Sequence, residues 1–150
     1  MAQTSNAYTG AAATVSIKVA AGAYVDISGS SQSVDAVTAT VVTGDAYTFD
    51  GDYAITTVGK FEPVEIKVNI LYTEISSEAF LTAQGAFANR SLVQVKWIPG
   101  GSASGSDTYE SKANGYITAL DYPPIDATSA GPIMVSFTVR APGITYTATA

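Results

Sequence analysis

The stretch VEIKVNILYTE, Val64–Glu74, alternates apolar and polar side chains almost residue by residue. Because side chains along an extended chain point to opposite sides in turn, this period of two predicts a β-strand with one buried and one polar face. At about 3.3 Å per residue the strand would be roughly 33 Å long, which exceeds the common strand length. The polar face carries Glu65, Lys67 and Asn69, and the surroundings of that face are the main question for function.

Alternation and β-branched residues predict further strands on both sides of this stretch, separated by turn residues. These strands cover residues 14–20, 23–28, 34–43, 47–49, 53–58, 92–98, 108–112, 116–121, 133–140 and 144–148. Turns are expected at Gly44-Asp45, Asp50-Gly51 and Gly59-Lys60, and a loop at 29–33. Asn114-Gly115 predicts a hairpin between 108–112 and 116–121, because both positions tolerate positive φ.

One helix is predicted after the long strand. Ser76 is the expected N-cap, with Ile75 and Phe80 packing across it as a hydrophobic staple. Phe80 and Phe87 share one face, and Asn89 is the expected end. Many strands, frequent turns and a single helix predict an all-β fold with one helix, an antiparallel β-sandwich or barrel.

The chain of 150 residues is long enough for one domain with a normal core, which we expect to span 14–150. Residues 1–13 are small and polar, and predict an N-terminal arm that is loose or docked on a neighbour. Only 13% of residues are charged, about half the usual share, whereas 47% are hydrophobic. A lone monomer would expose much weakly polar surface, so part of that surface is expected to contact other subunits.

The net charge of −6 argues against a protein that grips nucleic acid, because phosphate neutralisation needs clustered basic residues and the seven present are scattered. The first residues lack a basic leader with an apolar run, and no later run approaches membrane-spanning length. The sequence therefore predicts neither export nor a membrane partner. The absence of cysteine removes any disulfide framework, which favours assembly in a cytoplasm.

Catalytic chemistry has few candidates in this chain. The absence of histidine and cysteine removes the commonest general base, the usual transition-metal ligand and the thiol nucleophile. A carboxylate pair could still hydrolyse a glycoside, but thirteen scattered acidic side chains more often solubilise a surface. We therefore predict no enzyme activity, no catalytic residues, no cofactor and no metal site.

Two motifs resemble ligand sites only weakly. Asp45, Asp50 and Asp52 offer oxygen ligands for a hard cation, but their spacing fits no EF-hand loop and turn residues capping their own backbone explain them better. The glycines of 100–105 lack the Lys-Ser or Lys-Thr pair and the helix of a phosphate loop. A surface loop is the better interpretation of that segment.

Nine tyrosines and one tryptophan are spread along the chain. They are Tyr8, Tyr24, Tyr47, Tyr53, Tyr72, Trp97, Tyr109, Tyr116, Tyr122 and Tyr146. Such side chains can line a sugar-binding platform. On strands, however, they more often straddle core and interface, where one end is apolar and the other finds a polar partner.

Several segments, taken in order, resemble the tail tube proteins of long-tailed bacteriophages. The most specific are GKFEPVEIKVNILYTE (59–74) and VQVKWIPGG (93–101), with the predicted helix between them. YVDISGSSQSV before them and YPPID after them extend the resemblance from about Tyr24 to Arg140. The resemblance implies a β-sandwich with a flanking helix whose subunits form hexameric rings, stacked into a hollow tube that conducts DNA. One sheet of each subunit would join its neighbours in a continuous inner barrel.

The resemblance also implies an environment for the polar face: Glu65, Lys67 and Asn69 would line the lumen. With −6 on each of six subunits, the ring would repel DNA phosphates, so DNA would pass without specific binding. The loose segments are the expected inter-ring contacts, represented by Tyr8, Ser30, Ser31, Ser104 and Gly105. Besides further copies of itself, the implied partners are tail terminator, distal tail and tape-measure proteins, in a virion assembled in the host cytoplasm.

The main alternative is a monomeric β-sandwich module that binds carbohydrate or a cell surface, which the aromatic and weakly polar composition suits. Another is a related self-assembling tail component, such as a contractile-tail tube subunit, a terminator protein or a tube subunit of a domesticated phage particle. The sequence leaves both contractile and non-contractile tails open.

Overall fold

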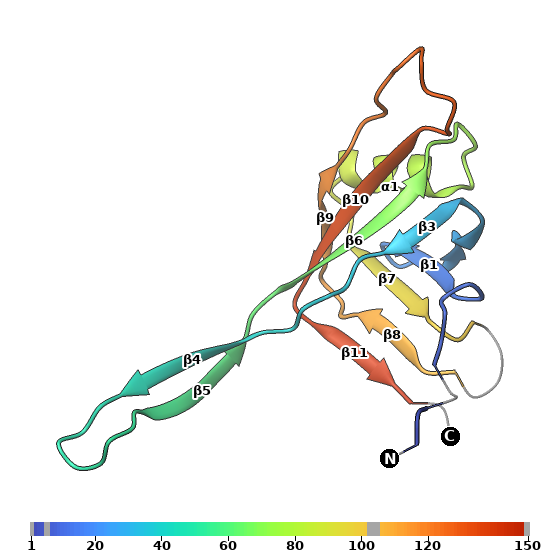
Figure 1. Ribbon diagram of the computed structural model, residues 1–150. Helices are drawn as coiled ribbons and strands as arrows, with labels where there is room; N and C mark the ends of the chain where they lie inside the picture. Colours follow the sequence, from blue (N-terminus) through green and yellow to red (C-terminus); the bar gives the residue numbers. More distant parts are fainter. Residues whose placement is uncertain (1, 5–6, 102–105, 149–150) are drawn as a thin grey trace.

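The computed structural model describes residues 2–4, 7–101 and 106–148. Two antiparallel sheets lie against each other around one core, and neither closes into a barrel (Figure 1). The first sheet has the order β11-β8-β7-β1-β2, with strands β1 Thr14–Val19, β2 Val25–Asp26, β7 Val93–Ile98, β8 Thr108–Ser111 and β11 Ile144–Thr147. The second has the order β3-β6-β10-β9, with strands β3 Ser31–Val34, β6 Val64–Leu71, β9 Tyr116–Leu120 and β10 Met134–Ala141. The predicted antiparallel β fold with one helix is confirmed.

The strand predicted over 64–74 is β6, in the middle of the four-stranded sheet, but it ends at Leu71 rather than Glu74. It pairs with β10 over eight consecutive residues, from Val64↔Ala141 to Leu71↔Met134. Ile66, Val68 and Ile70 are completely buried and pack on side chains of β1 and β7 from the other sheet. The apolar half of the alternation is thus the centre of the core.

A two-stranded hairpin projects away from the sandwich, and we call residues 41–61 the hairpin arm (Figure 1). Its strands β4 (Val41–Ala46) and β5 (Ile55–Phe61) pair only with each other among the described strands. The strand predicted at 53–58 is confirmed in part, since β5 begins at Ile55 and continues to Phe61. The short strand predicted at 47–49 and the turns predicted at Gly44-Asp45 and Gly59-Lys60 are wrong. Gly44 pairs with Thr57, so Gly44 and Asp45 belong to strand β4 and not to a turn. The tip of the hairpin lies at 47–54, where Gly51 takes a φ of 93°.

Three other predicted segments differ from the structure. The expected loop 29–33 is a 3-10 turn, η1 (Ser28–Ser30), followed by β3, which pairs with β6. The strand predicted at 34–43 is divided, because the chain leaves β3 after Val34 and crosses to the arm. The strand predicted at 23–28 shortens to the two residues of β2.

The predicted hairpin at Asn114-Gly115 is also wrong. β8 and β9 lie in different sheets, so the turn carries the chain from one sheet to the other. Asn114 does have a positive φ of 71°, but Gly115 does not, so a type I′ turn is absent. Gly115 is needed for another reason: its backbone passes close to Val93 O and Arg140 O, between the two sheets.

The single helix, α1 (Ala79–Ala88), packs against β9 and β6 and ends at Asn89 as predicted. The N-cap, however, is Glu78 rather than Ser76, and Ile75 is 56% exposed instead of forming a staple. The amide of Ala79 donates to Ser30 Oγ at 3.2 Å, so a residue distant in sequence caps the first turn. Within the described residues, no helix combines the length and apolarity needed to span a bilayer.

The close approach at Gly115 gives a testable prediction. In Gly115→Ala, the new Cβ would lie 3.0 Å from Val93 O and 3.2 Å from Arg140 O, both backbone atoms. We expect this crowding to lower the free energy of unfolding by about 1–3 kcal/mol in urea titrations. Gly85→Ala is the matched control, because an added Cβ in the exposed helix meets open space and should stabilise by about 0.5–1 kcal/mol. Equal effects of the two substitutions on the free energy of unfolding would contradict the close backbone approach at Gly115.

Candidate assembly surfaces

The polar face of the four-stranded sheet is the first candidate surface. Glu65, Lys67 and Asn69 lie on the side of β6 that is turned away from the core, as the alternation predicts. Directly opposite them on β10 lie Arg140, Thr138 and Ser136. These β10 residues were not predicted from the sequence, although Ser136, Thr138 and Arg140 alternate with buried apolar residues in the same way.

Hydrogen bonds organise this polar face. Asn69 Nδ2 donates to Ser33 Oγ at 2.9 Å and to Asp35 Oδ1 at 2.8 Å, which ties β6 to β3 and the residue following it. Ser136 Oγ donates to Asp121 Oδ2 at 2.7 Å, which ties β10 to the chain after β9. The polar side chains therefore satisfy one another across the sheet.

Charges on the polar face nearly cancel. Arg140 Nη1 lies 3.2 Å from Glu65 Oε1, an exposed pair that contributes at most about 1 kcal/mol. Asp35, Glu65 and Asp121 against Lys67 and Arg140 give this described face a net charge of −1. The surface is polar and slightly acidic, and it contains no cluster of cations.

The four-stranded sheet has two open edges. Among the residues that the structure describes, β3 pairs only with β6, and β9 pairs only with β10 apart from a single bridge between Tyr116 and Leu92. Each edge presents unpaired backbone N–H and C=O groups, which favour pairing with another strand. Since one sheet carries both edges, copies of this chain can in principle join side by side through it.

The five residues expected at inter-ring contacts are placed differently from one another. Tyr8 is 73% exposed, and its ring lies close to Gly100, so the N-terminal segment meets the start of the glycine-rich loop. Ser30 is only 4% exposed and caps α1, whereas Ser31 Oγ donates to Ile27 O at 2.8 Å. Ser104 and Gly105 lie outside the described residues. The inter-ring role of all five stays a prediction.

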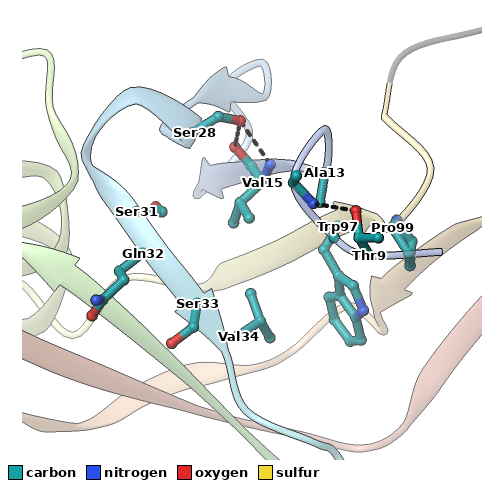
Figure 2. A pocket seen from close by; sticks show the side chains of 12 residues that line it. Thr9, Ala13, Val15, Ser28, Ser31, Gln32, Ser33, Val34, Trp97 and Pro99 are labelled. Atoms are coloured by element: carbon teal, nitrogen blue, oxygen red, sulfur yellow. Dashed lines mark hydrogen bonds between the residues drawn. The ribbon is translucent and has the colours of Figure 1, made fainter.

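A hollow of about 600 Å³ lies between the N-terminal segment, β3 and Trp97, and we call it the Trp97 hollow (Figure 2). Ser28 holds its rim, since its Oγ accepts from Val15 N at 2.8 Å and donates to Val15 O at 3.3 Å. Its other walls come from Gln32, Ser33 and Pro99. No charged side chain lines it, so it is suited to weakly polar contacts.

An aromatic ladder runs across the end of the five-stranded sheet. Trp97 stacks on Tyr109 with ring centroids 5.9 Å apart, and Tyr109 lies 5.4 Å from Tyr146. Tyr146 donates its hydroxyl to Asp107 Oδ2 at 2.6 Å, and this bond raises the pKa of Tyr146. The ladder is the feature that best suits the alternative of a sugar-binding platform.

The opposite face of the five-stranded sheet carries a small charged cluster. The Tyr24 ring lies 4.4 Å from Lys96 Nζ and 5.9 Å from Lys18 Nζ. Its hydroxyl is buried without a hydrogen bond of good geometry in the described structure, although the Glu110 carboxylate is nearby. Burial, and then the Glu110 carboxylate, raise the pKa of Tyr24 strongly.

The hairpin arm carries seven of the sixteen exposed large hydrophobic side chains in the described ranges. Its exposed large hydrophobic side chains are Val42, Tyr47, Phe49, Tyr53, Ile55, Val58 and Phe61. A concentration of exposed apolar side chains of this kind is typical of an interaction site. Most of these residues were predicted on strands of the sheet, so the sequence did not indicate that no described part of their own subunit covers them.

The acidic residues of the arm do not converge on a metal site. Asp45 Oδ1 accepts a hydrogen bond from Thr56 Oγ1 at 2.8 Å across the hairpin. Asp50 and Asp52 lie at the tip. Across the described ranges, no group of three or more His, Cys, Asp or Glu side chains is placed to hold a metal ion.

No protein-family model matches the chain, and no curated protein matches it by sequence. Solved structures do match over nearly its whole length. A chain in the sixfold-symmetrised structure of the anti-feeding prophage (AFP) baseplate has a TM-score of 0.75 at 11% identity, covering 99% of this chain and 98% of that chain. A chain in the C6-symmetric tail of an empty GTA particle has a TM-score of 0.69 at 12% identity, with 96% and 100% covered. A chain of the SPP1 tail tube has a TM-score of 0.62 at 16% identity, with 95% and 80% covered.

These likenesses define the class of fold. The two sheets and one helix are arranged as in tail components of phages and phage-like particles. The chain has the tail tube type of fold, and the resemblance found in the sequence is thereby confirmed at the level of structure. Identities of this size carry no information on individual residues.

The raised pKa of Tyr24 gives a testable pH dependence. Above the ordinary tyrosine pKa of 10.0 the unfolded chain releases this proton while the folded chain keeps it, so Tyr24 makes stability fall as pH rises past 10.0. In Tyr24→Phe we expect a smaller fall, measured by urea unfolding below and above that pH. Tyr47→Phe on the arm controls for the substitution itself. A wild-type pH profile in Tyr24→Phe would show that Tyr24 titrates normally.

Proposed function

We propose that this protein is a structural tail subunit whose copies close into hexameric rings, which stack into a hollow tube that conducts DNA. The observation that carries the proposal is the four-stranded sheet: one face is buried, the other is polar, and both edges are open, within a tail tube type of fold. The sixfold symmetry in the descriptions of two of the similar assemblies supports the number six.

In this proposal the ring closes by strand pairing. The free edge of β9 in one subunit pairs with the free edge of β3 in the next, so that the four-stranded sheets form one continuous inner barrel. Closure removes every open edge of that sheet, which a lone subunit would leave available for aggregation. The polar face then lines the lumen, with Glu65, Lys67 and Asn69 among the lining residues.

A lumen of this kind suits passive conduction of DNA. Tight binding to DNA depends on several Lys or Arg side chains that neutralise phosphates. The polar face offers two basic side chains against three carboxylates, and Arg140 is already paired with Glu65. DNA would therefore slide along the wall without specific contacts or catalysis.

The proposed tube needs other components at its ends and inside it. Terminator, distal tail and tape-measure proteins are the proposed partners, in a virion tail assembled in the host cytoplasm. A second candidate function is a monomeric carbohydrate- or surface-binding module, which the aromatic ladder of Trp97, Tyr109 and Tyr146 favours.

Negative-stain electron microscopy of the purified protein at high concentration, together with light scattering, tests the proposed function. We expect rings or hollow tubes, because contacts with further subunits would stabilise both the open sheet edges and the exposed hairpin arm. A monomer at every concentration, with or without tail fractions added as initiator, would contradict ring assembly. Glycan screening would then test the second function.

The lumen assignment is tested by labelling. The chain has no cysteine, so single cysteines react cleanly with a polymer-linked maleimide too large to enter a tube. Lys67→Cys, exposed on the polar face, should react in the monomer and be protected in the tube. Thr145→Cys, exposed on the other sheet, is the matched control and should react in both states. Equal reaction of the two variants in tubes would mean that the wrong sheet has been assigned to the lumen.

A further inference from the structure

The tip of the hairpin arm combines aromatic and acidic side chains. Tyr47, Phe49 and Tyr53 are 83%, 114% and 89% exposed. Asp50 and Asp52 lie between these rings, and residues 47–54 include no Lys or Arg. The tip therefore presents three aromatic rings with a local charge of −2.

Within the described residues, nothing in the same subunit covers this tip. A two-stranded hairpin on its own is at most marginally stable in water, and β4 and β5 pair only with each other within the described structure. Large exposed aromatic side chains on such an element are best stabilised by an apolar surface elsewhere. The acidic residues further restrict the surface that would bind the tip, because their carboxylates favour a surface that also carries a Lys or Arg side chain.

A hollow with these properties lies at the end of α1. It has a volume of about 510 Å³, and its walls are Phe87, Ala88, Tyr116 and Ile117, with Arg90 as its single charged lining residue. We call it the Arg90 hollow. Arg90 follows the helix in the left-handed conformation, with a φ of 52°. Its side chain is exposed and has no carboxylate partner among the described ion pairs.

Three other hollows of the described chain fit the tip less well. The Trp97 hollow is lined by no charged residue. A depression on the polar face is lined by both Lys67 and Asp121, whose charges sum to zero. The hollow at the root of the arm is likewise lined by both Lys112 and Glu62. Of these surfaces, the Arg90 hollow alone unites apolar walls with a net positive charge.

We propose that the tip of the hairpin arm of one copy docks in the Arg90 hollow of a second copy. An aromatic ring of the tip fills the hollow, and Asp50 or Asp52 pairs with Arg90. The inference rests on the proposed self-assembly and specifies which two surfaces meet. Because the hollow lies beside the open edge strand β9, docking also fixes the arm next to the edge that a neighbouring sheet would join.

Charge reversal tests the docking. Arg90→Glu places a carboxylate against the acidic tip, and we expect it to raise the concentration needed for assembly by about tenfold or more. Asp50→Arg with Asp52→Arg should have the same effect, and the two sets combined should restore assembly. Lys112→Glu changes the charge equally but in the hollow at the arm's root, and should leave assembly unchanged. Wild-type assembly of Arg90→Glu, or no restoration in the combined variant, would overturn the docking.

Disulfide trapping provides a second readout that does not depend on charge. Copies carrying Asp52→Cys are mixed with size-tagged copies carrying Ala88→Cys, since the natural chain has no cysteine. We expect mixed disulfide dimers under mild oxidation, and far fewer when Thr145→Cys replaces Ala88→Cys. Rings without these dimers would overturn the docking and leave the proposed function standing. Dimers without rings would support the docking and contradict the proposed function, and absence of both would overturn both.

Discussion

The register between β6 and β10 is the constraint on which the rest of the structure depends. Eight consecutive pairs fix the two central strands, and a slip of one residue would turn the buried side chains outward and Lys67 inward. The same register sets Glu65 opposite Arg140 and Asn69 opposite Ser136. A single strand register therefore determines both which side chains enter the core and which side chains form the polar face. Any assembly that uses this sheet inherits a polar face whose hydrogen bonds are already made.

The local sequence was sufficient to predict an element wherever the alternation of apolar and polar side chains determines its type and its buried face. The alternation of 64–74 predicted β6 with its buried and polar faces, and Asn89 was predicted correctly as the helix end. At Asn114-Gly115 the same kind of evidence failed. A turn signal says that the chain reverses, but it does not say that the flanking strands pair. Here Ser111 Oγ accepts from Val95 N and Gly115 O from Val93 N, which binds the two flanks to β7 instead of to each other.

The candidate surfaces were only half predictable, because they depend on contacts distant in sequence. Ser30 was expected in a loop at a subunit contact, yet its hydroxyl caps α1 and is buried. Tyr47 and Tyr53 were expected on short strands, but the chain extends them beyond the sandwich on the hairpin arm. In both cases the residue types were read correctly. The sequence could not show that Ser30 contacts the distant helix α1, or that Tyr47 and Tyr53 are left uncovered by the described part of their own subunit.

The distribution of exposed apolar side chains bears on how assembly would proceed. Seven of the sixteen exposed large hydrophobic side chains in the described ranges lie on the arm. Covering seven such side chains would contribute roughly 10 kcal/mol or more. Association of two subunits costs about 4–15 kcal/mol in lost translational and rotational freedom. Burial of the arm alone therefore gives a net free energy of association near zero for a pair of subunits. In the proposed tube, stable growth would therefore require arm contacts and strand-edge pairing together, which would make assembly cooperative and keep copies apart at low concentration.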